Sequence, residues 1–186
     1  MWTKQRSWSF KQPTLIHGKT VEQVESFTYL GLTLDNKLRF DQHITSIHKR
    51  FQQRLHVIRK LRSLSVAPHL LLLLYKSIIQ PVLLYCSACY FTILSMPNRN
   101  KLYSITRIAS KIIGLPIPTL ADMNNKAITR LALSIISDTE HPLYRYFNLM
   151  PSGRRYRSLK WEKVRFSRSF VPTAIAALNN LKLPRR

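Results

Sequence analysis

The side chains with the clearest chemistry in this sequence are its cations. The 186 residues include 30 Lys and Arg against 8 Asp and Glu, which gives a formal net charge of +22 at pH 7. From residue 42 to residue 121 there is no Asp or Glu at all, so the cations of that stretch have no neighbouring carboxylate with which to pair. Ammonium and guanidinium groups bind phosphate by charge and by hydrogen bonding. The charge balance therefore predicts a polyanionic partner, and nucleic acid is the first candidate.

Two segments concentrate these cations, a basic amphipathic helix expected at 44–64 and a basic stretch at 154–168 that is interleaved with aromatic residues. We expect the cations to contact phosphates and the aromatic rings to stack on bases. No donor set is arranged for base edges, so RNA or DNA should be held with little sequence preference. The predicted nucleic-acid-binding residues are Lys49, Arg50, Arg54, Arg59, Lys60, Arg62, Arg154, Arg155, Tyr156, Arg157, Lys160, Trp161, Lys163, Arg165 and Arg168.

The sequence offers little evidence for a catalytic site or a metal site. Cys86 and Cys89 form a C-x-x-C inside an apolar stretch that we expect to be helical, but a zinc site needs two further ligands at matching spacing. We interpret them as small core residues. The eight carboxylates are dispersed, whereas phosphoryl transfer on Mg²⁺ needs clustered oxygen ligands. The sequence therefore predicts no catalytic residue, no metal site and no cofactor.

The elements that would position the cations are mostly helices. Asp41 suits an N-cap, and the apolar residues after it recur at helical spacing on one stripe: Ile44, Ile47, Phe51, Leu55 and Ile58. Further helices are expected at 70–80, apolar almost all round and interrupted by Pro81, at 98–113, at 120–137 with Leu131 facing inward, and at 173–181. Before residue 41 we expect a small hairpin, 14–17 with 19–24, and one strand at 27–34.

Residues 70–94 could instead cross a membrane. Ser77–Asn98 carries no charge over 22 residues, a length compatible with a span. Basic residues flank both sides, so no orientation is selected, and a buried helix pair is the favoured interpretation. The first thirty residues contain no apolar run typical of a secretory signal, which favours an intracellular location in the cytoplasm or nucleus.

Several segments resemble, in order and spacing, the region after the catalytic palm of LINE-type (non-LTR retrotransposon) reverse transcriptases. The resemblance runs from about Ile16 to Leu181. Its main segments are Phe27–Asp35, Leu38–Ile44, Leu74–Tyr85, Arg107–Pro116, Pro151–Tyr156 and Ser169–Ile175.

This resemblance implies a primer-grip-like turn at Tyr29, Leu30 and Gly31, followed by a helical thumb and a C-terminal tail. The polymerase motif of the family, an aromatic residue and Ala followed by two Asp, is absent from this sequence. What the resemblance implies is therefore a noncatalytic remnant that binds the backbone of an RNA or DNA duplex. The parent family is an RNA-directed DNA polymerase, so enzymatic activity stays an open question.

A second resemblance covers about residues 24–64, which are similar to the domain named after the N-terminal region of the alkylated DNA repair protein AlkB homologue eight. That name implies an association with 2-oxoglutarate oxygenase or RNA methyltransferase activity, which we keep as the alternative function. An iron triad needs His-x-Asp/Glu plus a distal His, and Asp41-Gln42-His43 has the reverse order. We expect the resemblance without the activity.

Together these observations predict a mainly α chain: a thumb-like helical bundle with a small N-terminal β element and a basic, partly irregular C-terminal tail. The expected domains are an unstructured leader at 1–13, the β element at 14–40, the helical domain at 41–140, and the basic, aromatic-rich tail with a short terminal helix at 141–186.

Overall fold

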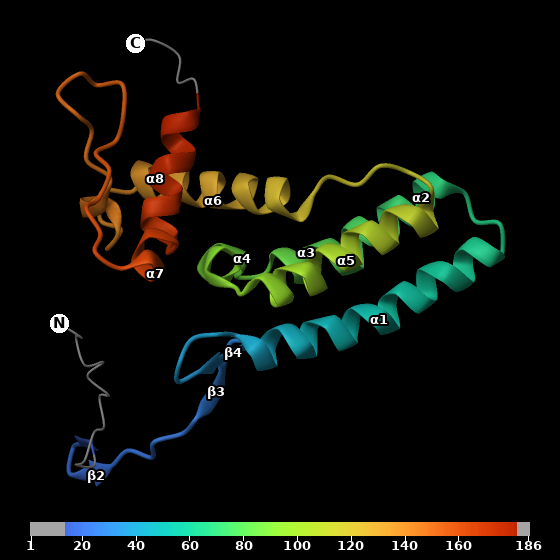
Figure 1. Ribbon diagram of the computed structural model, residues 1–186, viewed down its shortest axis with the longest axis horizontal. Coiled ribbons are helices and arrows are strands. Elements are labelled where there is room, and N and C mark those ends of the chain that lie inside the picture. Colours follow the sequence, from blue (N-terminus) through green and yellow to red (C-terminus); the bar gives the residue numbers. More distant parts are fainter. Residues whose placement is uncertain (1–13, 182–186) are drawn as a thin grey trace, which may run out of the picture.

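The computed structural model describes residues 14–181 and shows a mainly helical chain, as predicted (Figure 1). The leader expected at 1–13 lies outside the described residues. The helices α1, α2 with α3, and α5 lie side by side, and α6 leads from them to a second group that contains α8.

Two short antiparallel hairpins precede the first helix. The first pairs β1 (Leu15–Ile16) with β2 (Lys19–Thr20) and confirms the predicted hairpin. The second corrects the prediction of one strand at 27–34: β3 (Ser26–Tyr29) pairs with β4 (Leu32–Asp35) around a two-residue turn. Leu30 and Gly31 form this turn with φ of 47° and 81°, the left-handed conformation that such tight turns require.

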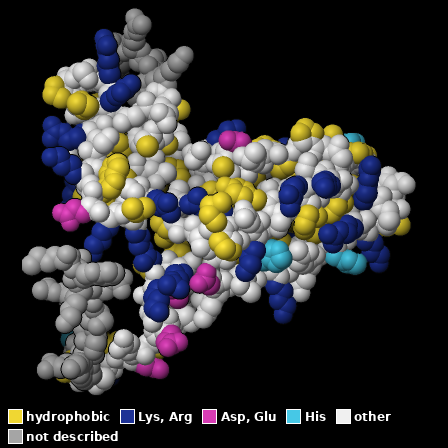
Figure 2. Space-filling model, in the orientation of Figure 1, with side chains coloured by type: hydrophobic (Ala, Val, Ile, Leu, Met, Phe, Trp, Pro, Cys, Tyr) yellow, Lys and Arg dark blue, Asp and Glu magenta, His cyan; other side chains and the backbone are white. Residues whose placement is uncertain are grey.

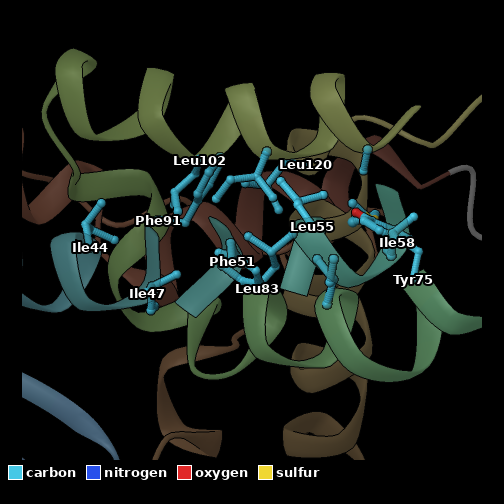
Figure 3. Close-up of a cluster of buried hydrophobic side chains, with 14 of the residues drawn as sticks. Ile44, Ile47, Phe51, Leu55, Ile58, Tyr75, Leu83, Phe91, Leu102 and Leu120 are labelled. Carbon is cyan, nitrogen blue, oxygen red and sulfur yellow. The ribbon is translucent and has the colours of Figure 1, made fainter. Parts of the chain in front are cut away.

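The helix α1 (Asp41–Ser63) buries the whole predicted apolar stripe (Figure 3). Asp41 is not its N-cap, however. It is the first helical residue, and Phe40 precedes it in a left-handed conformation without a side-chain cap. The Asp41 carboxylate instead accepts a hydrogen bond from the Asn98 side-chain amide at 2.6 Å, so it links α1 to α5.

The next helical stretch runs through Pro81 without a break. The helix α2 (Pro68–Leu74) continues as the π-helical segment η1 (Tyr75–Ile79) and then as α3 (Gln80–Leu84). A proline lacks the N–H and crowds the carbonyl four residues before it. The wider π turn directly before Pro81 accommodates this clash, so the expected interruption is a local widening.

Only one side of this stretch is buried. Leu71 and Leu83 are in the core, whereas Leu70 and Leu73 are 50% and 61% exposed. The helix is apolar almost all round, yet only one of its faces is buried in the core.

A left-handed residue, Cys86, separates α3 from the short helices α4 (Ser87–Tyr90) and η2 (Phe91–Ile93). The helices α5 (Met96–Ile113) and α6 (Leu120–Ser137) match their predicted spans closely. The remaining elements are η3 (Tyr144–Tyr146), α7 (Val164–Ser167) and α8 (Phe170–Asn180). α8 begins three residues earlier than predicted.

The core is divided into two hydrophobic clusters that share α6. The first cluster joins α1, α2–α3 and α5 with the start of α6, including Leu120 (Figure 3). The second joins later turns of α6 to α8: Ile128, Ala132, Ile135, Ala174, Ile175 and Leu178. Residues of the predicted tail thus pack against α6 in the second cluster, in addition to forming an irregular loop. Leu131, expected inward, is exposed.

Among the described residues, no single helix has both the length and the apolar character of a membrane span. Pro68–Leu84 and Ser87–Ile93 reach that length and composition only as a pair bent by 41°. Their inward side chains, such as Leu83 and Tyr90, are buried in the first cluster.

Candidate nucleic-acid interface

The outward face of α1 carries exposed cations and is held in place by the stripe on its other side. Burial of Ile44, Phe51 and Leu55 fixes the rotation of the helix. Lys49 and Lys60 lie opposite the buried stripe, with Arg50 and Arg59 on its flanks, and we call these four exposed cations the α1 basic face. Arg62 is also exposed but lies in the last turn beside Gly114 at the end of α5. No acidic residue follows Asp41 in this helix.

Arg54 is a predicted nucleic-acid-binding residue whose side chain makes a contact within the protein. Its side chain is half-buried, and its guanidinium donates a hydrogen bond to the carbonyl of Ile78 in the π segment. The contact joins α1 to η1, so Arg54 is engaged in packing and does not belong to the α1 basic face.

The second predicted segment forms a loop between η3 and α7. The backbone N–H of Arg157 donates to the Asn148 carbonyl at 2.7 Å, and that of Met150 to the Arg155 carbonyl at 2.8 Å, so the start of the loop is a small hairpin. We call residues 149–163 the C-terminal basic loop. Its exposed predicted residues are Arg154, Arg155, Arg157, Lys160, Trp161 and Lys163.

Tyr156 anchors this loop, and its side chain is half-buried. Its ring meets Phe147 edge-on at 6.3 Å between centroids. Its backbone N–H donates to the Asn179 side-chain oxygen at 2.7 Å, and its carbonyl accepts from the Asn179 amide at 3.0 Å. Trp161, which is 53% exposed, and the exposed Phe166 are the aromatic residues in solvent here.

Arg165 and Arg168 follow the loop in and after α7. Arg165 donates from Nη2 to the Leu38 carbonyl at 2.8 Å and also to the Lys37 carbonyl. This contact attaches α7 to the connection between β4 and α1. The Arg168 side chain is exposed.

The two predicted segments form two separate basic regions. α1 runs along one side of the molecule, and the C-terminal basic loop projects beside α8 at the far end of α6 (Figure 1). Figure 2 shows Lys and Arg gathered over the helices of the first cluster and again over the C-terminal part, with most acidic side chains on this face toward the β hairpins.

Tyr29, Leu30 and Gly31 come together in the turn between β3 and β4. Tyr29 and Leu30 are well exposed, and the Leu30 carbonyl accepts a hydrogen bond from the Tyr85 hydroxyl at the end of α3. The primer-grip-like turn is therefore attached to the helical part.

Several carboxylates accept hydrogen bonds from neutral groups of the protein. Asp35 accepts from the backbone N–H groups of Lys37, Arg39 and Phe40. Burial raises the pKa of Asp35, but these hydrogen bonds, Arg39 first, outweigh burial and leave the pKa below its ordinary value. Asp122 pairs with the Thr119 hydroxyl at 2.6 Å. Asp35 thus holds the turn before α1, and Asp122 stabilises the start of α6.

Sequence reasoning missed a set of polar residues on α5. Asn100, Ser104, Arg107 and Lys111 recur at spacings of four, three and four, and all line one groove beside α6. The signal was present in this spacing, which places the four on one stripe of a helix.

The C-x-x-C pair does not lie within a helix core as expected. Cys86 is half-buried at the left-handed break before α4, and Cys89 is exposed. Within residues 14–181, no three His, Cys, Asp or Glu side chains are grouped closely enough to hold a metal ion.

Comparison with known proteins gives two matches. The family model described as "Alkylated DNA repair protein alkB homolog 8, N-terminal" matches residues 40–81, which start later and end later than the resemblance predicted at 24–64. These residues cover α1, α2 and η1.

The second match is the RNA-directed DNA polymerase from mobile element jockey of Drosophila melanogaster, which is 32% identical over 108 residues. The match covers 54% of this chain and 11% of the polymerase. No solved structure matches. Both predicted resemblances are confirmed, and the chain is distantly similar to part of a retrotransposon reverse transcriptase.

Proposed function

We propose that this chain is a noncatalytic nucleic-acid-binding segment of retrotransposon origin that holds the phosphate backbone of an RNA or DNA duplex. The observation that carries the proposal is the α1 basic face, a set of exposed cations on a helix whose other side is buried in the core. The jockey relative is an RNA-directed DNA polymerase, and this similarity supports the same partner.

The α1 basic face suits a phosphate backbone in length and in chemistry. Lys49 and Lys60 are eleven residues apart, about 16 Å along a helix. One strand of a duplex carries a charge about every 3.4 Å along its axis, so this face can contact several phosphates. Contacts with phosphate oxygens carry no sequence information, so this face predicts little sequence preference.

The C-terminal basic loop supplies a second contact of mixed type. Arg154, Arg155 and Arg157 offer guanidinium groups, whose fork geometry suits phosphate oxygens. The exposed Trp161 adds an aromatic surface for stacking against a base or a sugar.

A salt titration with a labelled 20-base-pair duplex tests the proposal. With about six phosphate contacts, affinity should fall about a thousandfold between 50 and 200 mM salt. Lys49→Ala/Lys60→Ala should make the log–log slope less steep by about 1.8, whereas Lys126→Ala/Arg130→Ala, an equal charge loss on exposed α6 positions, should leave it unchanged. A slope near zero for the wild-type chain contradicts duplex binding.

Two activity assays test the noncatalytic part. Primer extension with Mg²⁺ and nucleotides, and 2-oxoglutarate turnover with Fe(II), should both give no product. Product in the first assay would identify a polymerase, and in the second an oxygenase.

A further inference from the structure

A groove of about 900 Å³ opens between α5 and the first turn of α6. It is separate from the residues proposed for duplex binding, since no member of the α1 basic face or the C-terminal basic loop lines it. None of its described lining residues is acidic. They are Asn100, Tyr103, Ser104, Thr106, Arg107, Ser110, Lys111, Ile117, Thr119, Leu120 and Ala121.

Hydrogen bonds within the protein leave three charged or amide donors for a ligand. The hydroxyl of Ser104 donates to the Lys101 carbonyl at 2.7 Å, and that of Ser110 donates to the Leu115 carbonyl at 2.9 Å. The Asn100 amide and the exposed cations Arg107 and Lys111 then remain along one stripe of α5. A row of donors without a carboxylate suits a chain of anions.

The stripe has the length of a short run of phosphates. Asn100 and Lys111 are eleven residues apart, about 16 Å along the helix. Arg107 and Lys111 stand one turn apart, about 6 Å, so they can reach neighbouring phosphates of one strand.

An aromatic side chain lies in the same groove. The half-buried ring of Tyr103 is held edge-on against Phe91, with 6.0 Å between centroids. A ring fixed in this way presents a preformed surface for an unpaired base. A groove that tracks a backbone and carries an aromatic ring is the arrangement by which proteins hold single strands without sequence preference.

We propose that the groove between α5 and α6 binds a single strand of nucleic acid, with Arg107 and Lys111 on phosphates and Tyr103 against a base. The groove is lined by α5 on one side and by the start of α6 on the other, so a flexible single strand can follow it between the two helices. The assignment goes beyond duplex binding on the α1 basic face and does not depend on it.

The test uses the full chain and a labelled twelve-residue oligothymidylate, which forms no duplex. Arg107→Ala/Lys111→Ala should make the log–log salt slope less steep by about 1.4, the loss of two single-strand contacts. The matched control Lys126→Ala/Arg130→Ala removes the same charge outside the groove and should keep the wild-type slope. Tyr103→Leu should weaken binding at least about fivefold with the slope unchanged. Circular dichroism checks that each variant is folded.

Several results would overturn the groove assignment. They are no oligothymidylate binding by the wild-type chain at 50 mM salt, an unchanged slope in the groove variant, or equal losses in the groove and control variants. If salt-dependent duplex binding persists in any of these cases, the groove assignment fails while the proposed function stands. If the oligothymidylate binds through the groove but the duplex does not bind, the proposed function fails alone.

Discussion

At the scale of single residues, His43 is a titratable side chain that links α1 to β4 and α4. It is buried at the start of α1, its Nδ1 accepts a hydrogen bond from the Thr33 backbone N–H at 3.4 Å, and its ring meets Tyr90 edge-on at 5.2 Å. Burial first, and then the positive charge of Arg50, lower the pKa of His43 below its ordinary value of 6.5. The folded state therefore favours the neutral ring.

This shift predicts a loss of stability in acid. Below about pH 6.5 the unfolded chain binds a proton at this position more readily than the folded chain, so the free energy of unfolding should decrease as the pH falls. Urea unfolding at pH 8, 7, 6 and 5 measures the trend. His43→Gln should remove this part of the pH dependence, and His56→Gln, at an exposed position, should retain it. Equal pH profiles for wild type and His43→Gln contradict the prediction.

A second prediction for a single residue concerns the stability that Arg54 contributes. Arg54→Ala removes the donor to the partly buried Ile78 carbonyl, and an unsatisfied buried group of this kind costs about 1–3 kcal/mol. Arg59→Ala, at an exposed position of the same helix, should change the free energy of unfolding by less than about 0.5 kcal/mol. Chemical denaturation of both variants at pH 7 checks the difference. Equal losses would show that the Ile78 contact contributes nothing.

The roles of individual residues were the least predictable from the sequence. Arg54 and Tyr156 read as interface residues because their types and neighbours fit, yet their partners Ile78 and Asn179 lie 24 and 23 residues away. Such partners are set by helix packing, which local patterns do not contain. The buried stripe of α1, by contrast, follows directly from helical periodicity.

At the scale of elements, helix ends with strong stop signals were predictable. Gly114 ends α5 with a φ of 77°, and the Thr119 hydroxyl accepts a hydrogen bond from the Asp122 N–H at the start of α6. The hairpin of β3 and β4 was missed because residues 27–34 have the pattern of one strand, and only Gly31 signalled the turn. The π segment before Pro81 was also missed, since a proline predicts disruption without specifying its form.

At the scale of elements, we predict the effect of replacing Gly114 at the end of α5. Its left-handed conformation costs a residue with a Cβ about 1–2 kcal/mol. Gly114→Ala should therefore lower the free energy of unfolding by about 1 kcal/mol, and Gly114→Asn by less, because asparagine tolerates this conformation. The midpoints of urea unfolding show which of the two variants is the less stable. Equal or reversed losses would mean that the backbone is free to change at this position.

At the scale of the whole molecule, the two hydrophobic clusters define the architecture. The charge imbalance follows from the composition, and the mainly helical class could be predicted from the helical periodicity. The sequence could not show that α6 belongs to both clusters or that the cations form two regions, because both depend on where α8 packs.

The shared helix leads to a prediction about cooperativity. Leu178→Ala creates a cavity in the second cluster, where Leu178 is fully buried, and should cost about 2–5 kcal/mol. Hydrogen exchange should accelerate in α8 and the last turns of α6, while α1 keeps its protection. Uniform acceleration across α1 would instead indicate one cooperative unit.

The helix α6 determines how the two hydrophobic clusters are held relative to each other. Its first turn is embedded in one core and its later turns in the other, with no flexible tether in between. A rod of 18 residues is about 27 Å long. The C-terminal basic loop is therefore attached to the first cluster through a continuous helix, and packing fixes its position relative to the α1 basic face.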